Sequence, residues 1–91
     1  MADDRAVPPE LAAWTATLVY EFGLDAEQVP IGPILGLAAV AAHGVTRPAA
    51  PLSAFVAGLV AGQHGATPEE IAAAIGEIRS LIADQETDAA D

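Results

Sequence analysis

Residues 33–63 read PILGLAAVAAHGVTRPAAPLSAFVAGLVAGQ, and this stretch decides the fold. Arg47 is its only formal charge, although the whole chain carries a net charge of −10. Glycine, proline and Arg47 divide it into apolar runs shorter than the ~20 residues that a membrane-spanning helix needs. We therefore expect two apolar helices, at about 33–43 and 51–63, joined by a tight turn, in a protein that does not cross a membrane.

Two amphipathic segments flank this stretch. The first has apolar residues at three- and four-residue spacing, which predicts a helix over about 9–22 that ends at Gly23. Residues 67–70 read Thr-Pro-Glu-Glu, the pattern of a helix N-terminal capping box. A helix over about 68–84 follows it, with four isoleucines on one face: Ile71, Ile75, Ile78 and Ile82.

The predicted fold class is all-α, a compact antiparallel four-helix domain over residues 8–84. Short connectors favour antiparallel neighbours. The acidic ends predict a frayed N-terminus at 1–7 and a disordered acidic tail at 85–91. Residues 25–28, Asp-Ala-Glu-Gln, have capping-box spacing and predict one further helical turn.

The third helix is expected to supply much of the core. Its large apolar residues predict an inward stripe, and its glycines are expected to let another helix approach closely. Trp14, on the first helix, is likewise expected to be core packing. The expected inward stripe of the third helix comprises Leu52, Phe55, Val56, Leu59 and Val60, and its glycines are Gly58 and Gly62.

Composition excludes several functional classes. Three arginines and no lysine cannot form the basic patch that neutralises nucleic-acid phosphates, so no nucleic-acid partner is expected. The absence of cysteine excludes disulfides and cysteine zinc sites. No cofactor is expected. The acidic N-terminus lacks the apolar segment of a signal peptide, which predicts a cytoplasmic location.

His43, Arg47 and Ser53 are the candidate site residues, because they cluster around the turn between the two apolar helices. One interpretation is structural: His43 and Arg47 bond the open carbonyls that end the second helix. The alternative is a site for an anionic small molecule, built from Arg47 and the start of the third helix. A contact with a partner protein is the third possibility. The middle of the chain has no carboxylate to orient His43, so no catalytic residue is predicted.

No metal site is expected. His43 and His64 are the only imidazoles, and they lie at opposite ends of the third predicted helix. That helix is about 20 Å long, from ~1.5 Å per residue, so the two side chains cannot share one ion within a chain.

Residues 42–52 read Ala-His-Gly-Val-Thr-Arg-Pro-Ala-Ala-Pro-Leu. This run resembles an uncharacterised family of small helical proteins that typically read Ala-His-x-Val-x-Arg-Pro-Ala-Ala-Pro-Leu here. Members of that family are free-standing or joined to molybdenum-cofactor guanylyltransferases (MobA-like enzymes). The resemblance implies an association with molybdopterin guanine dinucleotide biosynthesis, and His43 and Arg47 match the pattern residue for residue.

The function expected from the sequence is a non-catalytic helical module that acts by protein contact. Its partner is another protein, with a cofactor-biosynthesis enzyme as a candidate, or a second copy of the chain. An Ala-rich core buries little area per residue, so self-association into a homodimer is a reasonable expectation. The alternative is a small domain that binds an anionic or phosphorylated ligand through Arg47 and His43.

Overall fold

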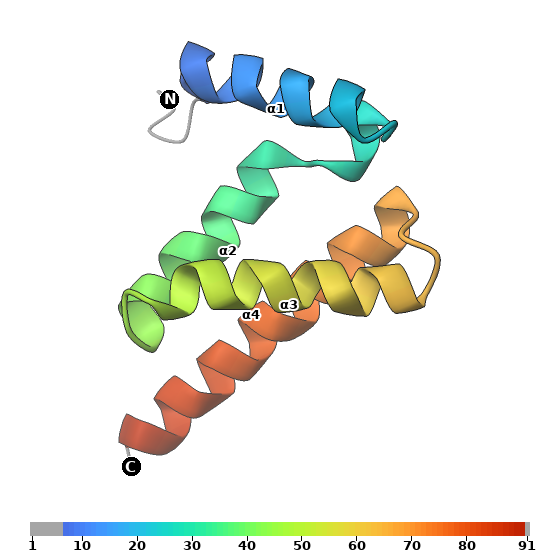
Figure 1. Cartoon of the computed structure of the whole chain (residues 1–91). Helices are drawn as coiled ribbons and strands as arrows, with labels where there is room; N and C mark the ends of the chain where they lie inside the picture. Colours follow the sequence, from blue (N-terminus) through green and yellow to red (C-terminus); the bar gives the residue numbers. More distant parts are fainter. Residues whose placement is uncertain (1–6, 91) are drawn as a thin grey trace.

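Four α-helices follow one another in the computed structural model, which describes residues 7–90 without the side chains of residues 87–90 (Figure 1). The part of the chain that is described contains no strand. It is an all-α, four-helix domain, as predicted. In chain order, the elements are α1 (Pro9–Glu21), the 3-10 turn η1 (Ala26–Gln28), α2 (Ile31–Gly44), α3 (Ala49–Gln63) and α4 (Pro68–Ala90).

Local signals set the end of α1 and the start of α4 close to their predicted positions. Gly23 has φ +63°, a conformation that favours glycine after a helix. The backbone N–H of Glu70 donates to Thr67 Oγ1 at 3.1 Å, which is the expected N-cap of α4. η1 is the helical turn predicted after Asp25.

The end of α4 was placed too early. The helix continues to Ala90 rather than ending at 84, because residues 85–90 contain no Gly or Pro to stop it. Residues 1–6 and 91 lie outside the described part of the chain. The predicted frayed N-terminus at 1–7 therefore lies outside it, except for residue 7.

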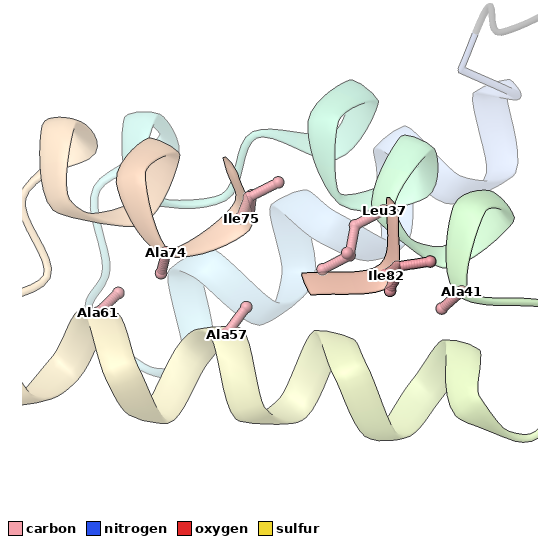
Figure 2. Close-up of a cluster of buried hydrophobic side chains, with 7 residues drawn as sticks. All are labelled: Leu37, Ala41, Ala57, Ala61, Ala74, Ile75 and Ile82. Carbon is pink, nitrogen blue, oxygen red and sulfur yellow. The ribbon is translucent and has the colours of Figure 1, made fainter. Parts of the chain in front are cut away.

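The hydrophobic core lies where α2, α3 and α4 pack together. Figure 2 shows its buried side chains pointing inward from these three helices. Alanines contribute most of them, with Leu37 and two isoleucines as the large members. The buried residues of the described part are Leu37, Ala41, Ala57, Ala61, Ala74, Ile75 and Ile82.

α4 buries the face that its sequence predicted, but α3 does not. Ile75 and Ile82 are buried, and Ile71 and Ile78 pack against the core. The predicted inward stripe of α3 was wrong. Its large residues point outward, with Phe55 65% exposed, and only Val60 packs against the core.

The inward face of α3 is made of small residues instead. Ala57 and Ala61 are buried there, and Figure 2 shows both pointing from α3 into the core. α3 is apolar on all sides, so its sequence period cannot choose a face. Small side chains let its backbone approach α2 and α4 closely, and this selects the alanine face.

α1 lies apart from the core, across the first turns of α2 (Figure 1). None of its residues is buried, and it makes no extended contact with another helix. Trp14 is 57% exposed, so the prediction that it packs in the core was wrong.

Glycine gives close helix approach at the end of α2, not in α3 as predicted. A Cβ added to Gly58 or Gly62 would meet no atom within 4 Å. A Cβ added to Gly44 would lie 2.7 Å from Ile82 Cγ2. α4 therefore leaves no room for a side chain at Gly44, which faces Ile82.

Candidate functional site

The three predicted site residues lie around one corner of the fold. His43 is in the last turn of α2, Arg47 is in the turn that follows, and Ser53 is near the start of α3. His43 and Arg47 are exposed, and Ser53 is half-buried. Local sequence positions all three, because the connection between the two helices is only residues 45–48 and ends at Pro48, whose ring fixes φ.

His43 bonds within its own helix. Its Nδ1 lies 2.9 Å from the carbonyl oxygen of Ala39, one turn earlier. An exposed imidazole on the carbonyl end of a helix complements the partial negative charge there. This geometry gives His43 a local role at the end of α2.

Arg47 has no ion pair with any residue that the structure describes, and its side chain is exposed. Its contribution to the turn comes from its backbone, whose carbonyl oxygen accepts from the N–H of Ala50 at 3.1 Å. The structural interpretation, in which the guanidinium bonds the open carbonyls at the end of α2, stays a prediction. The side chain is accessible at this corner.

Removing the Arg47 side chain should leave stability nearly unchanged. For Arg47→Ala we expect a change within about 0.5 kcal/mol, as for other surface substitutions. A change of about 0.5 kcal/mol in the free energy of unfolding shifts the thermal midpoint by no more than roughly 4 °C in a domain of this size.

Arg79→Ala is the matched control for this measurement by circular dichroism. Arg79 reaches α2, since its Nη1 lies 3.1 Å from the position of a Cβ on Gly36. A midpoint that falls further for Arg47→Ala than for Arg79→Ala would contradict the exposed position of Arg47.

The start of α3 offers few donors to an anion. The N–H of Ala49 donates to Thr46 O at 2.9 Å, and that of Ala50 donates to Arg47 O. Pro51 has no N–H. An anion at this corner would depend on the Arg47 side chain, so the anion-site alternative stays a prediction with little support from the backbone.

An extended apolar surface without a partner lies on α3. Four large side chains share its outward face at three- and four-residue spacing, and we call them the α3 stripe: Leu52, Phe55, Val56 and Leu59. All four are exposed, and α3 contains no charged residue. Contiguous exposed apolar surface on a small protein marks an interaction site.

α1 carries a second apolar face without a partner, the α1 stripe. It has the same spacing and comprises Leu11, Trp14, Leu18 and Phe22. Trp14 and Phe22 are exposed, and Leu11 and Leu18 are half-buried. The sequence indicates both stripes, but their spacing predicts core, so their exposure is a finding of the structure. The apolar character of α3 on all sides leaves its inward face undecided in the sequence.

A cavity of about 250 Å³ opens beside the core, and the sequence did not predict it. Its wall is apolar apart from Gln28, and includes Leu37 from α2, Ala57 from α3 and Ile75 from α4. The amide of Gln28 is already bonded: Nε2 donates to Ala66 O at 3.0 Å, and Oε1 accepts from the N–H of Asp25 at 3.1 Å. Gln28 therefore ties η1 to the turn before α4.

The described residues contain no cluster of three or more histidine or acidic side chains that could hold a metal ion. None of their helices has both the length and the apolar character needed to cross a membrane.

The chain belongs to the family described as a domain of unknown function, DUF6457, which matches residues 6–90. The match includes all four helices. No curated protein and no solved structure matches the chain.

Proposed function

We propose that this chain is a non-catalytic helical module that acts by protein contact, and that the α3 stripe is its contact surface. The observation that carries the proposal is the orientation of α3. The helix turns Ala57 and Ala61 into the core and leaves Leu52, Phe55 and Leu59 in solvent. Full burial of an exposed side chain of this size is worth about 1.5–3 kcal/mol, and a partner surface would recover the share that corresponds to the part still exposed.

The absence of charge on α3 favours a partner whose contact surface is apolar. α3 carries no charge, while the chain as a whole has a net charge of −10. The α3 stripe is therefore a place where another protein can dock without meeting carboxylates. Aromatic residues are typical anchors of such surfaces, and Phe55 lies in the middle of this one.

The family resemblance adds a candidate partner. The run that carries it, residues 42–52, ends at Leu52, the first residue of the α3 stripe. We propose a molybdenum-cofactor guanylyltransferase as that partner, in the cytoplasm. The support is the resemblance and its position beside the apolar surface.

Affinity capture from cells that express the chain naturally tests the proposal, with three baits. The unmodified chain is compared with Phe55→Asp, which places a charge in the α3 stripe, and with Leu81→Asp. Leu81 is a matched control because it is 66% exposed on α4, outside both stripes. We expect a protein captured by the unmodified chain and by Leu81→Asp to be lost with Phe55→Asp.

The same three baits are then titrated with purified guanylyltransferase by calorimetry. Saturable binding that Phe55→Asp weakens would support this enzyme as the partner, and no binding would remove it. If all three baits capture the same proteins in the first experiment, the α3 stripe is not a contact surface.

A further inference from the structure

The α1 stripe and the α3 stripe match each other as two halves of a helix pair. In each, large apolar side chains three or four residues apart share one face, as they do on packed helices. The α1 stripe runs from Leu11 to Phe22 and the α3 stripe from Leu52 to Leu59. At ~1.5 Å per residue these lengths are roughly 16 and 10 Å, so α1 can cover the whole α3 stripe.

The charges of the two helices permit this pairing. α3 has none, and α1 has only Glu10 and Glu21, near its ends. Two copies that each carry a net charge of −10 repel one another over most of their surface. A contact between α1 and α3 brings no carboxylate of one copy against a carboxylate of α3 in the other.

The exposed area of the chain is large for its mass. The accessible surface is 6312 Å². A compact monomer of 9.2 kDa exposes roughly 4,900 Å². The difference is roughly 1,400 Å², and a stable interface takes ~800 Å² per partner.

The chain holds its own α1 away from its own α3. η1 follows α1 and is tied to the turn before α4 by the bond from Gln28 Nε2 to Ala66 O. From there α1 crosses the start of α2, while α3 lies further along that helix (Figure 1). The α3 stripe of the same copy is therefore not the surface that α1 covers.

We propose that the partner of the α3 stripe is α1 of a second copy, exchanged reciprocally in a twofold dimer. The inference rests on the proposed α3 contact surface but assigns that surface to a second copy, so a guanylyltransferase could bind there only by displacing α1. Each copy donates one α1 and receives one, so the contact forms twice and both stripes are covered. A symmetric contact between two α3 helices would leave the α1 stripe, with Trp14, in solvent.

Mass and fluorescence are measured first, over a range of concentrations, on the unmodified chain, Phe55→Asp and Leu81→Asp. Trp14 is the only tryptophan, so its emission reports α1 alone. We expect the unmodified chain and Leu81→Asp to reach the mass of a dimer, with a blue shift of Trp14 emission as they associate. Phe55→Asp should weaken association by at least about tenfold, as expected for loss of an interface anchor. Circular dichroism confirms that each variant is folded.

Cross-linking identifies the helices that meet, and the absence of native cysteine makes it specific. A copy with Trp14→Cys is mixed with a copy with Phe55→Cys and treated with a short bis-maleimide. We expect a dimer that links the two different copies, and no such product when Leu81→Cys replaces Phe55→Cys. A product formed only between two Phe55→Cys copies would overturn the exchange in favour of an α3–α3 contact.

The remaining outcomes separate this inference from the proposed function. A monomeric mass at every concentration overturns the dimer, while capture of another protein that depends on Phe55 would still support the contact surface. A dimer whose mass and Trp14 emission do not change with Phe55→Asp overturns the exchange of α1, because it forms through neither stripe, while the contact surface is then decided by the capture experiment alone.

Discussion

Leu37→Ala should unfold much of this domain at temperatures where the unmodified chain is stable. Leu37 is 0% exposed and is the largest fully buried side chain among the described residues. Figure 2 shows it pointing from α2 into the core, near Ile82 of α4. It also lines the cavity of about 250 Å³, so its truncation would enlarge a space that the small core cannot close.

The expected cost follows from these surroundings. Truncation of a buried leucine to alanine costs about 2–5 kcal/mol, and more where the cavity persists. A small domain has a total stability of about 5–15 kcal/mol, so this is a large part of it. The thermal midpoint should fall by roughly 10–30 °C.

Leu81→Ala is the control, because it makes the same chemical change at an exposed position of α4. We expect its midpoint to stay within a few degrees of the unmodified chain, at the same protein concentration. Equal midpoints for Leu37→Ala and Leu81→Ala would show that Leu37 is not the centre of the core.

Gly44→Ala should also destabilise the fold, although alanine is the better helix former. The added Cβ would lie 2.7 Å from Ile82 Cγ2 and 2.5 Å from Glu86 Oε2. Glu86 is exposed and can move aside, but Ile82 is buried and its branched side chain has one strongly preferred rotamer in a helix. α2 and α4 must therefore separate at this point.

The net effect is a competition between two terms. Overpacking costs about 1–3 kcal/mol. The gain in helix propensity is at most about 1 kcal/mol, and Gly44 is the last residue of α2, where this gain is smaller. We expect a net loss of about 1–2 kcal/mol, seen as a fall of roughly 5–15 °C in the thermal midpoint.

Gly76→Ala is the matched control, with the opposite sign. Gly76 lies inside α4, and a Cβ there meets no atom within 4 Å. Without a clash, the substitution should raise stability by about 0.5–1 kcal/mol. If Gly44→Ala stabilised the domain as Gly76→Ala does, α2 and α4 would not be in close contact at this end.

The sequence by itself determined that four helices form, where several of them begin or end, and which face of α4 points inward. Gly23 and Thr67 set helix ends because capping depends only on a few neighbouring residues. The inward face of α4 was predictable because its isoleucines lie on one side and its charges, such as Glu77, on the other. The candidate residues His43, Arg47 and Ser53 were placed at one corner because the turn between α2 and α3 is short.

Only the tertiary structure decided which face of α3 is buried and where α1 lies. The pattern of α3 cannot choose a face, since the helix has no charged side to mark the outside, and its large residues are the expected core only because they are large. Helix packing reverses this expectation, because Ala57 and Ala61 allow three backbones to approach where Phe55 and Leu59 would hold them apart. Contacts between distant segments, such as Gln28 with Ala66, decide the position of α1, and no local sequence signal reports them.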